Sequence, residues 1–132
     1  MKDIEELHFP EDIRYSQDHE WARPEGDLFV VGISDYAQDQ LGDIVFVELP
    51  ATGRTLTEGE DFGSVESVKA VSELLAPLAG EVVAVNAELE DQPEMVNSQP
   101  YKGGWMMKIK PANGADYDQL MDRDAYLNML KG

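Results

Sequence analysis

Short runs of apolar and β-branched residues alternate with Gly, Pro and Asn along most of the chain, a pattern typical of β-strands separated by turns. The pattern predicts strands at residues 28–33, 44–49, 61–67, 71–75, 80–85 and 105–110. Turn residues bound several of these runs, including Gly26 before the first, Pro50 after the second and Pro111 after the last. The chain is therefore expected to be mainly β.

Two segments depart from this pattern and indicate helix. Ser34 can cap a short internal helix that ends at Leu41, because Asp35 follows in the first turn and Gly42 follows the end. From about Asn113 the periodicity becomes helical, with Tyr117, Leu120 and Met121 on one face. A second short helical turn is expected to start at Asp122. Helices this short are marginal alone, so this tail is expected to pack on the β domain.

The size and composition suit one folded domain over residues 1–132, with a core at about 15–110 and a helical tail at about 113–131. The apolar fraction of 42% is ordinary for a folded protein, and the absence of cysteine excludes disulfides and cysteine metal sites. No apolar run approaches the roughly 20 residues needed to span a bilayer. The N-terminal residues resemble neither a signal nor a transit peptide, so a soluble cytoplasmic protein is expected.

Charge is the strongest feature of the composition: 27 acidic against 10 basic residues give a net charge of −17. Such a surface repels nucleic acid and anionic membranes, and it favours partners with basic docking faces. Solubility alone is an alternative explanation. No EF-hand loop is visible among the aspartates at 39 and 43, or at 116, 118, 122 and 124, and surface charge explains the latter group better. Neither metal binding nor independent catalysis is expected.

One lysine is isolated among acids. Between Arg54 and Lys102 the only basic residue is Lys69, whereas ten acidic residues lie from Glu58 to Glu94. Lys69 lies between the strands predicted at 61–67 and 71–75, so it is expected at the tip of a β-hairpin. On charge and spacing alone, the simpler interpretation is a set of weak surface ion pairs between this lysine and neighbouring glutamates.

Sequence motifs change that interpretation. The segment VESVKA at 65–70 resembles the lipoyl attachment site of glycine cleavage H proteins, and APLAGEV at 76–82 resembles the turn and strand that follow it. Further similar motifs lie in the same order as in the family: DHEW at 18–21, GISDYAQ at 32–38, LGDIVFVELP at 41–50, and NSQPY at 97–101 with GWM at 104–106. Together they extend roughly from residue 15 to residue 110.

The resemblance implies a lipoyl/biotinyl-carrier-like flattened barrel, a barrel-sandwich hybrid, with lipoic acid attached covalently to Lys69. It implies a monomeric carrier that is not itself an enzyme. The carrier takes the aminomethyl group of glycine from the pyridoxal-phosphate-dependent glycine decarboxylase (P protein) to the tetrahydrofolate-dependent aminomethyltransferase (T protein). Dihydrolipoyl dehydrogenase (L protein) reoxidises it, and a lipoate ligase or an octanoyl or lipoyl transferase modifies it. The cofactor supplies the covalent chemistry in such a system.

The resemblance also implies a cleft whose carboxylates hold the cationic amine of the loaded arm, since charge-assisted hydrogen bonds are strong. By position, the candidates are Glu20, Glu73 and Asp18. Some relatives have a histidine where this chain has Gln40, so no role of that histidine carries over. His19 belongs to the DHEW motif, but it is expected to serve packing and hydrogen bonding rather than catalysis.

Other functions remain open at this point. An H-like protein can donate lipoyl or octanoyl groups during protein lipoylation, and a lipoyl domain of a 2-oxoacid dehydrogenase complex is a further alternative. Those domains usually have aspartate immediately before the lysine, where this chain has Val68, and biotin carriers place their lysine between methionines. A purely structural binding module would leave Lys69 unmodified.

Overall fold

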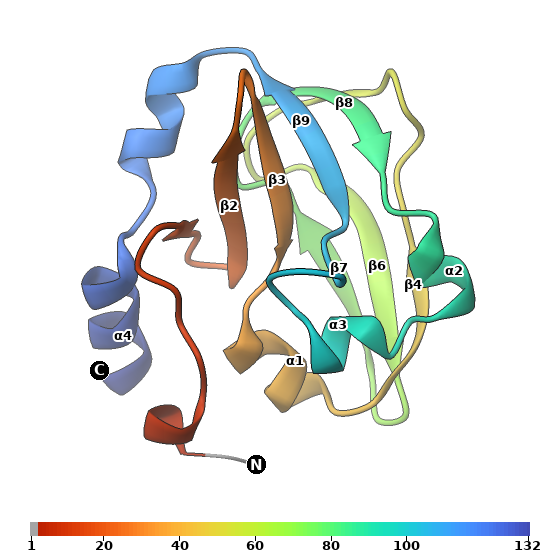
Figure 1. The fold of residues 1–132 in the computed structure, drawn as a ribbon, viewed down its shortest axis with the longest axis vertical. Coiled ribbons are helices and arrows are strands. Elements are labelled where there is room, and N and C mark those ends of the chain that lie inside the picture. Colours follow the sequence, from red (N-terminus) through yellow and green to blue (C-terminus); the bar gives the residue numbers. More distant parts are fainter. Residues whose placement is uncertain (1–2) are drawn as a thin grey trace.

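The computed structural model describes residues 3–132, so the first two residues of the domain expected over 1–132 lie outside it. Strands in this range form two antiparallel sheets, and short helices lie at their ends and on one side (Figure 1). In chain order the elements are η1 (Ile4–Glu6), β1 (Arg14–Tyr15), β2 (Glu20–Glu25), β3 (Leu28–Ile33), α1 (Asp35–Leu41), β4 (Ile44–Glu48), β5 (Thr55–Leu56), β6 (Asp61–Ser67), β7 (Val71–Leu75), β8 (Gly80–Val85), α2 (Glu88–Asp91), α3 (Met95–Ser98), β9 (Met107–Pro111), η2 (Gly114–Gln119) and α4 (Arg123–Lys131).

The larger sheet has the strand order β1-β2-β3-β9-β8-β5, and the smaller has the order β4-β6-β7. Apolar side chains from both sheets form one core cluster, which includes Val31, Phe62, Val65 and Ile109. The predicted mainly β fold with a short internal helix and a C-terminal helical segment is confirmed, and the two sheets remain separate rather than closing into one continuous barrel. None of the helices within residues 3–132 is long and apolar enough to cross a bilayer.

A second cluster lies between the larger sheet, the N-terminal segment and α4. Tyr126 of α4 stacks on Tyr15 with ring centroids 4.5 Å apart, and both side chains are fully buried. The cluster also contains Leu7, Phe9 and Ile13, which precede the range expected for the core. The helical tail therefore packs on the β domain as predicted, together with a segment that the hydrophobic pattern did not single out.

Trp21 joins three of the sequence motifs. It pairs across the sheet with Gly32, where a Cβ atom would lie 2.8 Å from the indole ring, so glycine leaves room for that ring. The indole nitrogen of Trp21 donates to the carbonyl oxygen of Pro100 at 3.0 Å. The DHEW, GISDYAQ and NSQPY segments thus meet around the buried Trp21 side chain, which holds the three segments together.

The internal helix and four of the strands have the bounds that the sequence predicts. Ser34 caps α1 by accepting from the amide of Ala37, and Gly42 follows its end with φ of 84°. Strands β3, β6, β7 and β8 match their predicted ranges, and β4 ends one residue earlier than predicted. Local signals suffice here because each run is bounded by capping or turn residues.

The prediction for the last strand was wrong at both ends, since β9 covers Met107–Pro111 rather than 105–110. The Asn86 side chain donates to the carbonyl oxygens of Gly103 and Trp105, both at 2.8 Å, and this holds the preceding segment as a loop. Pro111 pairs with Gly80 as the final residue of the strand. Proline is tolerated there because a strand end can lack an amide donor.

The C-terminal helix is also interrupted. Asn113 caps the 3₁₀ helix η2, and Asp122 caps α4 by accepting from the amide of Ala125. Leu120 and Met121 lie between these elements, where Met121 pairs with Tyr15 in an isolated β-bridge. The second helix starts as predicted after Asp122, but it extends for nine residues instead of one turn. Packing of Tyr126 stabilises this longer helix.

We expect Gly63→Ala to destabilise the fold, because a Cβ atom there would collide with the carbonyl oxygen of Glu48 on the paired strand β4. The clash is with backbone, which cannot rotate away, so the free energy of unfolding should fall by about 2–3 kcal/mol. Gly114→Ala is the matched control, since a Cβ atom there would contact nothing within 4 Å. Urea denaturation of both variants measures the difference, and equal stabilities would contradict the prediction.

Candidate functional site

Lys69 lies in the turn between β6 and β7, as the hairpin prediction states, and its side chain is exposed. This turn extends beyond the neighbouring strand ends in Figure 1. The strands pair up to Glu66 and Val71, which leaves Val68 and Lys69 at the tip. The arrangement presents the lysine amine to solvent on two paired strands.

Ser67 determines the shape of this turn. Tight hairpins usually need glycine or asparagine with positive φ, but no residue from Ser67 to Ala70 has positive φ. Instead, the buried Ser67 hydroxyl accepts from the amides of Lys69 and Ala70, both at 3.1 Å. The Ser67 amide donates to the Ala70 carbonyl oxygen at 2.8 Å. One serine thereby satisfies the backbone of the tip and fixes the direction in which Lys69 projects.

The tip also rests on the segment that follows α1. The amide of Val68 donates to the carbonyl oxygen of Asp43 at 3.1 Å. The Lys69 side chain lies over Gly42, where a Cβ atom would be 3.0 Å from the lysine Cε. Glycine is required at this position both for its positive φ and for the space that the lysine occupies.

Asn97 holds this supporting segment. Its side-chain nitrogen donates to the Gly42 carbonyl oxygen at 2.9 Å and to Gln38 at 2.8 Å, and its oxygen accepts from the Ile44 amide at 2.8 Å. The NSQPY motif contains this residue, but the sequence assigned it no role. Asn97 lies on α3 and supports the tip indirectly, through the segment of Gly42 to Ile44 on which the tip rests.

A cleft of about 270 Å³ lies beside the hairpin, between α1, the DHEW segment and β7. All three residues predicted to supply carboxyl groups, Asp18, Glu20 and Glu73, are among those that line it. Gln40 and His19 also line it, and among its described lining residues none is lysine or arginine. Its remaining walls are largely apolar and are formed by Ile33, Tyr36, Ala37, Leu41, Val65 and Leu74.

Glu20 differs from the other two carboxyl groups because it is buried, with 2% of its surface exposed. Its oxygens accept hydrogen bonds from the Ser16 hydroxyl at 3.0 Å and from the Leu75 amide at 3.3 Å. It therefore connects β2 of the larger sheet to β7 of the smaller one. Burial raises its pKa to about 8, although the Ser16 and Leu75 hydrogen bonds act in the opposite direction. Asp18 and Glu73 are exposed.

His19 has a strained backbone at the edge of this cleft, with φ of 74°. Its Nδ1 atom is 2.8 Å from the Tyr126 hydroxyl, which is also hydrogen-bonded to the Ser34 hydroxyl at 2.8 Å. Burial lowers the pKa of the His19 imidazole, so the neutral ring is favoured. Through Tyr126, the C-terminal helix contacts His19, which lines the cleft, and Ser34, which caps α1. The spacing of the tail residues gave no signal of this contact.

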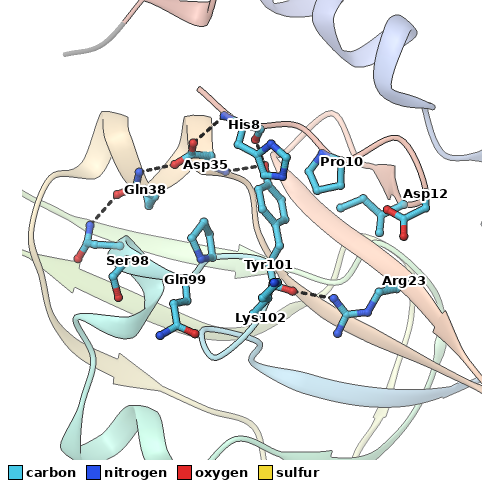
Figure 2. A pocket seen from close by; sticks show the side chains of 13 residues that line it. His8, Pro10, Asp12, Arg23, Asp35, Gln38, Ser98, Gln99, Tyr101 and Lys102 are labelled. Carbon is cyan, nitrogen blue, oxygen red and sulfur yellow. Dashed lines mark hydrogen bonds between the residues drawn. The ribbon is translucent and has the colours of Figure 1, made fainter. Parts of the chain in front are cut away.

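A larger cavity, about 550 Å³, lies apart from these carboxylates, between the N-terminal segment, α1 and α3 (Figure 2). A chain of hydrogen bonds crosses it, in which Asp35 accepts from the His8 amide at 2.8 Å and from the Gln38 side chain at 2.7 Å. Gln38 in turn accepts from Asn97. This series of hydrogen bonds ends where Asn97 binds Gly42, over which the Lys69 side chain lies, so these polar groups stabilise the segment that supports the lysine. Within residues 3–132, no group of three or more histidine, aspartate and glutamate side chains could hold a metal ion.

Comparison with known proteins gives consistent results. A family model described as Glycine cleavage H-protein matches residues 13–132. A glycine cleavage system H protein of Bacteroides fragilis is 55% identical over 120 residues, covering 91% of this chain and 95% of that protein. One from Brevibacillus brevis is 55% identical over 125 residues, covering 95% and 99%. The crystal structure of a glycine cleavage system H protein from Mycobacterium marinum superposes with a TM-score of 0.85 at 37% identity, covering 94% of this chain and all of the other.

The buried Glu20 predicts a pH dependence of stability. Its folded pKa of about 8 exceeds the ordinary value of 4.5, so the folded state binds the proton more tightly than the unfolded state. Stability should therefore fall as pH rises from about 4.5 and level off above about 8, by at most about 5 kcal/mol. Glu20→Gln lacks this ionisation and should lose less stability over the same range. Urea denaturation at pH 5, 7 and 9 tests this, and parallel pH profiles of the two proteins would refute it.

Proposed function

Because the chain belongs to the glycine cleavage H-protein family, we propose that Lys69 is the residue on which it carries a covalently bound lipoyl group. The protein is a carrier of the glycine cleavage system, as the 50–55% identity to family members over most of the chain indicates. The observation that supports the attachment site is the exposed position of Lys69 on a turn that Ser67 and Asp43 hold in place. It is also the lysine of the segment that resembles the family's attachment motif.

Attachment requires the neutral amine of Lys69, whereas an ordinary lysine is protonated at neutral pH. The amine attacks the carbonyl carbon of an activated lipoyl group, an amide bond forms, the activating group leaves, and the amine proton is released. Within this chain, Ser67 holds the backbone of the turn on which the exposed Lys69 lies. A lipoate ligase or an octanoyl or lipoyl transferase would supply the activated acyl group.

The neighbouring cleft suits a lipoyl arm. Its apolar walls match a hydrocarbon chain, and its carboxyl groups match a cationic amine at the end of that chain. When bound, the lipoyl group supplies a disulfide that accepts the aminomethyl group of glycine and is reduced as it does so. The chain's own residues would orient the arm, exclude water from it and hold its amine.

The carboxyl groups would differ in how they hold this amine. Glu73 is exposed, lies four residues beyond Lys69 and lines the cleft. Glu20 is buried, and a cation that approached it would favour its ionised form and lower its raised pKa. Docking of the amine would then release a proton from Glu20 below about pH 8. Catalysis would remain with the partners: glycine decarboxylase, aminomethyltransferase and dihydrolipoyl dehydrogenase.

Lys69→Arg tests the attachment site. Arginine keeps the positive charge and the exposed position, but its guanidinium is not an acyl acceptor for this chemistry, so modification should be lost while the fold is retained. Intact mass of protein from lipoate-supplied cells should show one lipoyl group on the wild type and none on the variant. Lys102→Arg, at another exposed lysine, should remain modified. A lipoyl group that persists on Lys69→Arg would refute the assignment.

Glu73→Gln tests the cleft. The variant should still be lipoylated and loaded, but it should release ammonia and formaldehyde from the isolated loaded protein about tenfold faster, because it loses one charge-assisted hydrogen bond. Glu81→Gln is the matched control, since Glu81 is an exposed strand carboxylate on β8, outside the cleft. Release at the wild-type rate in both variants would leave Glu73 an ordinary surface residue.

A further inference from the structure

Exposed large apolar side chains gather around Lys69. Among residues 3–132, five such side chains are exposed: Val45, Phe46, Val68, Val71 and Val83. The first four belong to the hairpin tip, its flank and the adjoining start of β4, with 49–68% of their surfaces exposed. We call these four residues the apolar rim. Val83 lies apart on β8 of the other sheet. Single exposed valines are unremarkable, but a group around one functional residue suggests an interaction surface.

A β-bulge in β4 produces half of this rim. Ile44 pairs with Ser67 and Phe46 pairs with Glu66, so two steps on β4 oppose one step on β6. Regular alternation would turn Phe46 inward if Val45 faced outward. The bulge instead exposes both side chains, while Ile44 and Val47 on either side remain buried. Bulges commonly redirect side chains next to functional sites, and this one turns a phenylalanine into solvent.

The rim is continuous with the lysine tip. Phe46 pairs with Glu66, which in turn pairs with Val71, so these residues form a row on the outer face of the smaller sheet. Val68 adjoins the row at the tip, since its amide binds the Asp43 carbonyl oxygen just before the bulge. A protein surface that approaches the Lys69 tip from the outer face of the smaller sheet will therefore contact the rim.

We propose that the apolar rim is the docking surface for the enzyme that attaches the lipoyl group to Lys69; this rests on the function proposed above. A lysine side chain is short, so an enzyme that acylates its amine must bring its own surface onto the tip. An enzyme that works at the far end of a lipoyl arm can dock at a greater distance. The exposed acids Asp43, Glu48 and Glu73 surround the rim, and Glu66 lies within it between Phe46 and Val71. The partner's face should therefore offer apolar groups to the rim and basic groups at its edge and opposite Glu66.

The test uses the unmodified full chain with a purified lipoate ligase, ATP and lipoate. Phe46→Ser and Val71→Ser should each raise the KM for the carrier about tenfold, as removal of an apolar interface anchor does, and leave kcat within about twofold. Val83→Ser is the matched control and should behave as the wild type. Because all three side chains are exposed, thermal unfolding should be nearly unchanged in each variant.

Each alternative gives a distinct result. If the wild type is modified and all variants match it in KM, the rim does not dock the ligase and the inference is wrong. If only the decarboxylase reaction of already lipoylated Phe46→Ser is impaired, the rim serves that enzyme and the inference is equally wrong. A wild-type dimer that Phe46→Ser dissociates, with unchanged KM, would assign the rim to a second copy of the chain. A wild type that is not modified at all overturns the function proposed for Lys69 and this inference with it.

Discussion

Strand β6 pairs with β4 along one edge and with β7 along the other, and the arrangement of the site depends on this double pairing. The pairing with β7 closes the turn that carries Lys69. The pairing with β4, which Gly63 allows by its close approach to the Glu48 carbonyl oxygen, brings the bulge and its exposed Phe46 beside that turn. Because β6 also contributes Phe62 and Val65 to the core, the lysine tip is an extension of the packed interior rather than an independent loop.

The tip combines local exposure with rigid support. Its backbone groups bind Ser67 and Asp43, and the segment below it is held by Asn97. The role proposed for Lys69 requires it to reach the active sites of several enzymes, so its side chain has to stay accessible. A fixed backbone lowers the conformational entropy lost when such a partner binds. The rigidity of the turn and the exposure of Lys69 are therefore compatible requirements.

Glu20 lowers the stability of the folded protein. A buried carboxyl group with a raised pKa destabilises the fold at high pH, where an apolar or amide side chain would not. It nevertheless joins the two sheets through Ser16 and Leu75 at the inner end of the cleft. Groups that reduce stability often lie at functional sites, where activity requires them. This agrees with its proposed role toward a cationic amine.

The sequence predicted strands β3, β4 and β6 to β9, the internal helix and the tip position of Lys69, because turn residues and alternation are local signals that Ser34, Gly42 and their neighbours carry. It did not predict β1, β2, β5, α2 or α3. It identified the family by motifs in a fixed order. The bounds of β9, the interruption after η2 and the length of α4 were decided by distant partners, namely Asn86 for β9 and Tyr15 for Met121 and for Tyr126 of α4.

The meeting of Asp18, Glu20 and Glu73 in one cleft was expected only through resemblance, and the burial of Glu20 could not be read from its neighbours in sequence. The apolar rim is likewise invisible to periodicity, because a bulge shifts the alternation of β4 by one residue when it pairs with β6. The local sequence pattern predicts the secondary structure that each segment favours independently of the rest of the chain. Burial, register and the spacing of charges across the cleft arise only when both sheets pack together, since they depend on residues far apart in the chain.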